Sequence, residues 1–326
     1  MDKPETSPID WPAVLALPKP LRRRAAAALG RYIGVPWAEE PEVSALVLAR
    51  FSDGEAVDGA LGVEAKELTE ADAAIMGRAS ARMLSEAMLT QSHREAIAKA
   101  AVDQIRLRQG DAVETDRLVE TGWLLTLAAR SQRSAEPVMQ RVWAAALASE
   151  ILDPGSVSPI LLNQLNKLGS RELGLVNKYA PMVISGEFIP VAKDDMAQLK
   201  SLFHLQSLGF VYGAGTTFEQ PGELDENGVF WIAVGEEAMV VRGEPGQTWQ
   251  LHGVFASETL QQLGRILNVE PGREAIINAA KAFLSMDMKA EVMRAKWVRE
   301  GDQVQFEPIE IYHSKPPAGA VVERVG

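Results

Sequence analysis

The side chains most often used for metal binding and acid–base chemistry are scattered along this chain. Two imidazoles that share a metal ion usually lie a few residues apart on one element, and no two histidines of this chain do so. His204 falls within an apolar helical pattern, where a hydrogen-bonded structural role is the simpler interpretation. The other three are His93, His252 and His313. We predict no metal site and no catalytic histidine.

The remaining reactive groups lack the neighbours that catalysis requires. Adjacent carboxylates usually point apart, whereas general acid–base chemistry needs two that face one another in contrasting environments. Ser156 lacks the glycines that flank a hydrolase nucleophile, and Gly213-Ala214-Gly215 is a turn rather than a phosphate-binding loop. The carboxylate pairs are Glu39-Glu40, Asp194-Asp195 and Glu236-Glu237. We predict no catalytic residue, no cofactor-binding residue and no cofactor.

The strongest concentration of positive charge lies between Leu17 and Gly34, where no acidic residue occurs. Basic side chains on a short helix could contact an anionic partner, either a nucleic acid or an anionic membrane surface. The cations are Lys19, Arg22, Arg23, Arg24 and Arg31. The acidic stretch that follows, from Glu39 to Asp72, offers these cations an intramolecular partner, so a structural role is favoured.

The composition is that of an ordinary globular protein with no membrane span. Apolar residues make up 47% of the 326 and charged residues 24%, which supplies enough apolar area for a sizeable core. A net charge of −11 opposes general attraction to nucleic-acid phosphates. There is no cysteine, and no apolar run approaches the ~18 residues needed to cross a bilayer. We predict a cytoplasmic location.

Hydrophobic periodicity and glycine or proline punctuation divide the chain into five predicted segments. They are a proline-rich start with a short basic helix and an acidic linker over 1–68, a helical domain over 69–168, a winged-helix-like unit over 169–215, an α+β region over 216–314 and a tail over 315–326. In the helical domain Met76, Ala79, Met83 and Ala87 share one face of a long helix. Ser134, Ser158, Ser170 and Ser257 are predicted to cap later helices.

The pattern between residues 169 and 215 reads helix, strand, helix, strand, with strands expected at 187–191 and 209–212. This order is typical of a winged helix. The predicted fold is therefore mainly α, with a winged-helix-like unit and a smaller α+β C-terminal part. Basic and acidic side chains are balanced within the unit, which argues against DNA readout.

A resemblance to an uncharacterised bacterial family rests on three consecutive stretches. They are Met139-Gln140-Arg141-Val142-Trp143-Ala144, Leu147-Ala148-Ser149-Glu150 and Pro154-Gly155-Ser156, followed by a leucine-rich helix. These resemble the pattern M-Q-x-L-W-A, L-A-x-E and P-G-S-x-S of a domain of unknown function, whose layout is similar to the Abi-alpha type of abortive-infection proteins. The chain departs from that pattern at Val142, where leucine is usual, and in a longer glycine-rich insertion after Tyr212. The resemblance carries no catalytic residues.

These observations favour a non-enzymatic interaction or regulatory protein that acts through its helical half, by contact with a protein partner or by self-association. The resemblance adds phage defence or stress control as the expected setting. One alternative is a nucleic-acid-associated regulator that uses the winged-helix-like unit and the basic N-terminal helix. Another is a peripheral membrane-associated effector, and an enzyme whose site is assembled from distant loops stays open.

Overall fold

The computed structural model describes residues 9–34, 70–215, 218–269, 271–286, 288–300 and 303–313. The chain divides into two compact units, Met1–Ser170 and Arg171–Gly326. The acidic linker and the tail predicted from sequence lie outside the described residues.

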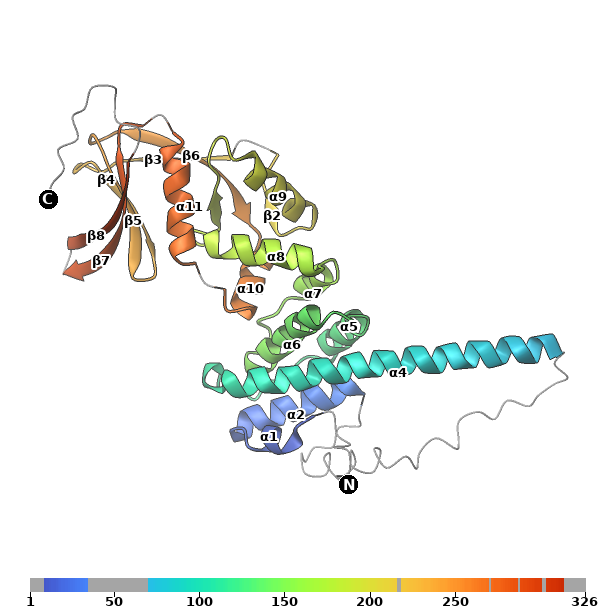
Figure 1. Ribbon diagram of the computed structural model, residues 1–326. Helices are drawn as coiled ribbons and strands as arrows, with labels where there is room; N and C mark the ends of the chain where they lie inside the picture. Colours follow the sequence, from blue (N-terminus) through green and yellow to red (C-terminus); the bar gives the residue numbers. More distant parts are fainter. Residues whose placement is uncertain are drawn as a thin grey trace. The chain divides into compact units, whose positions relative to one another are not determined.

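The first unit is helical (Figure 1). Its elements are α1 (Trp11–Leu15), α2 (Lys19–Ile33), α4 (Glu70–Leu107), the 3-10 helix η1 (Gln109–Asp111), α5 (Thr121–Ser131), α6 (Pro137–Leu152) and α7 (Pro159–Leu165). Helix α6 forms the centre, because every residue from Val142 to Leu152 is buried. An apolar helix buried all round needs neighbours on several sides, and α6 contacts α2, α4 and α5.

Several helix ends follow the local signals in the sequence. Helix α2 ends at Gly34, whose left-handed φ of 81° suits glycine, and α7 begins after Ser158, whose hydroxyl accepts a hydrogen bond from the Leu161 amide. The Ser257 hydroxyl caps α10 in the same way. The cap predicted at Ser134 is wrong, because α6 begins at Pro137 and its N-cap is Glu136.

The second unit mixes helices with two antiparallel sheets. Its helices are α8 (Ser170–Tyr179), η2 (Ala180–Met182), α9 (Met196–Ser207), α10 (Glu258–Ile266) and α11 (Arg273–Leu284). Its strands are β1 (Phe188–Pro190), β2 (Val211–Tyr212), β3 (Phe218–Glu223), β4 (Val229–Val234), β5 (Glu237–Arg242), β6 (Thr248–Ala256), β7 (Glu291–Glu300) and β8 (Gln303–His313).

The first sheet is organised around β6. Strand β1 pairs with its Gly253–Phe255 portion, β2 with Phe255 and Ala256, and β3 with Thr248 to Gly253. The second sheet has the order β4-β5-β7-β8, and each strand pairs with its neighbour in antiparallel register. Helix α11 contacts strands of both sheets, and its buried face joins a core that contains Met239, Trp249 and Phe283.

The prediction of a mainly α chain with a winged-helix-like unit is wrong. Helices hold 53% and strands 20% of the described residues, and two antiparallel sheets lie in the C-terminal part. The strands expected to complete a winged helix, β1 and β2, both pair with β6, which lies well beyond the predicted unit in the chain. Residues 169–215 therefore do not form a self-contained unit. Local patterning finds short strands but not their distant partner.

Candidate functional site

The apolar face of α4 extends beyond the part of the helix that the first unit covers. Ala98, Ala101 and Ile105 are fully buried on this face. Continuing toward the N-terminus in alternating steps of three and four residues passes the half-buried Arg94 and Gln91 and then reaches Ala87 and Leu84, which are exposed. The same stripe is therefore core at one end of α4 and surface at the other, where the helix projects past α2, α5 and α6 (Figure 1).

Large apolar side chains gather on this projecting half. Met83 is 65% exposed, Leu84 66% and Met88 73%, and Met83 and Leu84 belong to the stripe itself. A contiguous exposed apolar surface on a folded protein marks an interaction site, whereas isolated exposed residues need no explanation. The prediction that Met83 and Ala87 share one face of a long helix is confirmed. This part of the face is exposed rather than buried in the core of the first unit.

The predicted anion-contact residues on α2 separate into two groups. Arg24 is 1% exposed, and its guanidinium donates hydrogen bonds to the backbone carbonyls of Val113 (3.0 Å), Thr115 (3.0 Å) and Leu152 (3.2 Å). Burial lowers the pKa of Arg24 from its ordinary value, and Asp153 is the largest opposing influence. Arg24 thus ties α2 to two other segments of the first unit.

The other predicted cations of α2 reach the surface to different degrees. Lys19, Arg23 and Arg31 are exposed, and Arg31 donates a 3.2 Å hydrogen bond to the Thr121 hydroxyl. Arg22 is half-buried and donates to the carbonyl of Leu15 (3.2 Å). Contact of these four side chains with an anionic partner stays a prediction.

The stretches that carry the family resemblance have structural roles in this chain. Glu150 is 3% exposed, and its carboxylate accepts hydrogen bonds from the backbone amides of Gly155 (2.7 Å) and Val157 (3.0 Å). Burial raises the pKa of Glu150 above its ordinary value, although both amides favour the ionised form. Trp123 donates to the carbonyl of Val157 at 2.7 Å, so the turn after α6 is fixed from both sides.

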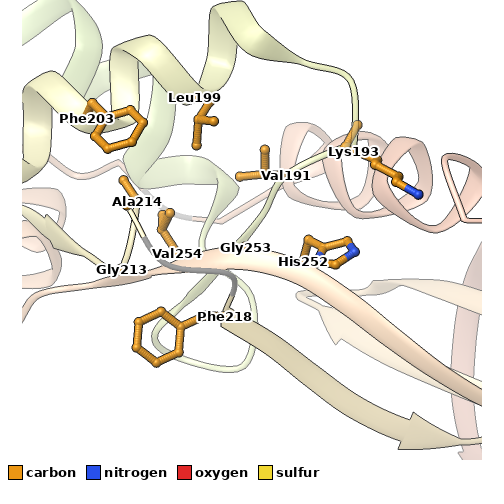
Figure 2. A pocket seen from close by; sticks show the side chains of 12 residues that line it. Val191, Lys193, Leu199, Phe203, Gly213, Ala214, Phe218, His252, Gly253 and Val254 are labelled. Atoms are coloured by element: carbon orange, nitrogen blue, oxygen red, sulfur yellow. The ribbon is translucent and has the colours of Figure 1, made fainter.

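A cavity of about 420 Å³ opens in the second unit, beside the first sheet (Figure 2). It is formed by the segment after β1, one side of α9, the segment after β2, the start of β3 and the middle of β6. Its lining comprises Val191, Ala192, Lys193, Leu199, Phe203, Gly213, Ala214, Gly215, Phe218, His252, Gly253 and Val254. A volume of this size and a mainly apolar wall are typical of small-molecule sites.

The polar side chains of the cavity lie together. Figure 2 shows Lys193 and His252 at one end, whereas Leu199 and Phe203 lie at the other. His252 Nδ1 lies 3.5 Å from Glu219 Oε1, across the β3–β6 pairing. The Lys193 side chain is exposed and forms no ion pair with any residue that the structure describes.

Two of the glycines that line the cavity lie close to other segments of the chain. A methyl group at Gly253 would meet the ring of Phe188 and the carbonyl oxygen of Ile189. Gly213 has a left-handed φ of 92°, and a side chain there would meet the Phe218 ring. The sequence pattern predicts only a turn at Gly213 and no role for His252. Strands β1, β2 and β3 come together by pairing with β6, and the sequence pattern does not predict this pairing.

The other histidine that the sequence singled out is used structurally. His204 Nε2 lies 3.1 Å from Glu172 Oε1, which is the hydrogen-bonded role expected of a helical imidazole. On the second sheet, Arg294 is 9% exposed and donates to both carboxylate oxygens of Glu237 (3.0 and 2.9 Å) and to Glu310 (3.4 Å). This network cross-links β5, β7 and β8, and none of its residues lines the cavity.

A family model described as "Protein of unknown function (DUF2806)" matches residues 77–207. The match supports a likeness to an uncharacterised domain-of-unknown-function family. It covers less than half of the chain and includes α4 to α9 but not the second sheet. No curated protein and no solved structure matches this chain. Among the residues described, no helix is long and apolar enough to cross a membrane.

Proposed function

We propose that this protein is a non-enzymatic interaction protein that self-associates through the projecting half of α4. The observation that carries the proposal is the exposed apolar surface at Met83 to Ala87, on the face of α4 that is buried at Ala98 to Ile105. Helices in proteins are stabilised mainly by packing of their apolar face. The projecting half of α4 has that face without a cover among the described residues.

The exposed i,i+4 ion pair of Arg82 and Glu86, at 3.7 Å, lies on the side of α4 opposite Leu84, so it leaves the apolar face free of charge. The helical contact is short, which places it at the low end of interface sizes. We therefore expect a dimer that dissociates on dilution.

Sedimentation velocity over a concentration series tests the proposal. Wild-type protein should shift from monomer to dimer as its concentration rises, and Leu84→Glu should remain monomeric. Leu89→Glu is the matched control, because Leu89 is also exposed (58%) but lies roughly 140° away around the helix. A monomer at all concentrations, or equal loss of the dimer in both variants, contradicts the proposal.

A role in phage defence or stress control rests on the layout similar to Abi-alpha type proteins and stays a proposal. Self-association of a regulatory protein fits that setting. Phage plating on strains with and without the gene tests it, and unchanged plating would contradict the defence role. Restoration of defence by the wild-type protein but not by Leu84→Glu would tie the role to the projecting helix.

A further inference from the structure

The cavity of the second unit has two chemically different ends. Val191 and Val254 contribute a buried apolar floor, and Leu199 and Phe203 extend it along α9. Lys193 and His252 supply the nitrogen-bearing side chains at the opposite end (Figure 2). A ligand that satisfies both ends needs an apolar body and a polar group that accepts hydrogen bonds.

We propose that this cavity binds a small amphiphilic monocarboxylate, with its apolar body against Leu199, Phe203 and Val254 and its carboxylate between Lys193 and His252. The proposal is independent of self-association, because α4 belongs to the other unit.

With His252 protonated, the charge at the polar end matches a single negative charge. Lys193 brings one positive charge and forms no ion pair with a described carboxylate, whereas His252 lies beside Glu219, at 3.5 Å. A protonated His252 and an ionised Glu219 cancel, which leaves a net charge of one; with a neutral His252 the ionised Glu219 reduces the net charge of this end to zero. The neighbouring Asp195 carboxylate accepts a hydrogen bond from the Gln198 amide at the start of α9. A phosphate dianion would therefore face a net charge too small to balance it.

The apolar end offers surface that a ligand would cover. Phe203 is 43% exposed and Phe218 is 41% exposed, and both line the cavity. Aromatic rings left in water at the wall of a concave site gain stability when an apolar group covers them. The apolar wall also disfavours a fully polar ligand such as a sugar or an amino acid with a charged side chain.

Calorimetric titration with matched probes tests the ligand class. The probes are 4-phenylbutyrate and octanoate, each compared with its own primary amide. The acid and the amide of each pair have the same apolar body, so the difference between their affinities gives the contribution of the carboxylate. We expect at least one acid to bind about tenfold or more tightly than its amide, because a charge-assisted contact is lost in the amide. Equal affinity within each pair, or no binding of either acid at millimolar concentration, overturns the proposal.

Two variants locate the carboxylate. Lys193→Met keeps the aliphatic chain but removes the charge, and it should weaken the acid about tenfold while leaving the amide unchanged. Lys200→Met is the matched control, because Lys200 is an exposed lysine on α9 that does not line the cavity. Equal effects of the two variants on acid binding overturn the placement of the carboxylate.

Filling the cavity tests the apolar end. A side chain at Gly215 would begin 3.4 Å from the Phe203 ring without backbone strain, so Gly215→Leu should occupy the space of the ligand. Acid and amide binding should both be lost while the thermal unfolding midpoint is retained. Retained binding in a folded Gly215→Leu protein would show that the probe binds elsewhere, and NMR shifts of the His252 ring on addition of acid give an independent check of location.

Discussion

The carboxylate of Glu150, at the buried end of α6, accepts a 3.0 Å hydrogen bond from the amide of Val157, seven residues further along the chain. The same carboxylate accepts from Gly155, and the Val157 carbonyl accepts from Trp123. One acidic side chain thus holds the turn between α6 and α7 in place. The pairing explains why a glutamate follows the apolar run of α6, where a fully buried acid would otherwise be unfavourable.

Replacement of Glu150 by alanine should destabilise the first unit by about 2–3 kcal/mol, because two backbone amides lose their acceptor. Urea unfolding followed by circular dichroism measures the effect. Glu114→Ala is the control, since Glu114 is exposed and should change stability by about 0.5 kcal/mol or less. A Glu150→Ala protein as stable as the control would contradict a structural role for this carboxylate.

Glu150 should also give the stability of the first unit a distinct pH dependence. Because burial raises its pKa in the folded state, the folded protein binds a proton at pH values where the unfolded chain has released it. Stability therefore falls as the pH rises from the ordinary glutamate value of 4.5 through the raised folded value. Unfolding free energies measured across this window should show the decline in wild-type protein and a smaller one in Glu150→Ala. Identical slopes would contradict the assignment.

Adjacent arginines on α2 should differ sharply in their effect on stability. Arg24→Ala removes the donor to the carbonyls of Val113 and Thr115 and one of two donors to the Leu152 carbonyl, and should cost about 2–4 kcal/mol. Arg23→Ala removes an exposed side chain and should cost about 0.5 kcal/mol or less. Thermal unfolding of the two variants gives the comparison. Weaker binding of Arg23→Ala than of wild-type protein to a nucleic acid or to anionic vesicles would support contact of α2 with an anionic partner.

Two glycines of the second unit should respond to alanine in opposite directions. Gly253→Ala should destabilise by about 1–3 kcal/mol, because the added methyl group meets the Phe188 ring and a backbone carbonyl. Gly174→Ala should stabilise by about 0.5–1 kcal/mol, since Gly174 lies within α8 with open space where the methyl group would go. Equal effects in calorimetric unfolding would contradict the close approach of β1 to β6.

Local signals in the sequence identify most elements but not the pairing between them. A short run of apolar and β-branched residues between glycines and prolines predicts a strand at 229–234, and the turn Glu300-Gly301-Asp302 predicts one at 303–312, close to β4 (Val229–Val234) and β8 (Gln303–His313). The sequence pattern misses strand β3 because Pro221 and Gly222 interrupt it. It also misses β6, the central strand of the first sheet. A proline is accommodated in β3 because this strand pairs with β6 along one edge, and the other edge pairs with no described strand.

The candidate sites are predictable to different degrees. The apolar face of α4 follows from its spacing, but its exposure does not, because a buried stripe and an exposed one have the same periodicity. Arg24 is grouped with its neighbours, since nothing in a run of three arginines distinguishes the one that turns inward. The cavity depends on contacts between segments that are far apart in the sequence. Lys193, which follows β1, and His252, in β6, are about sixty residues apart, and a single sequence does not reveal such contacts.

Helix α11 contributes side chains to the packing of both sheets in the second unit. Unfolding of either sheet would therefore expose the apolar side of this helix to water. The loss of this burial would destabilise the other sheet as well. Native-state hydrogen exchange should accordingly report one shared opening free energy for the central amides of β5, β6 and α11. The described part of the second unit would then melt as one cooperative block, and any ligand held beside β6 would slow proton exchange in strands it never touches.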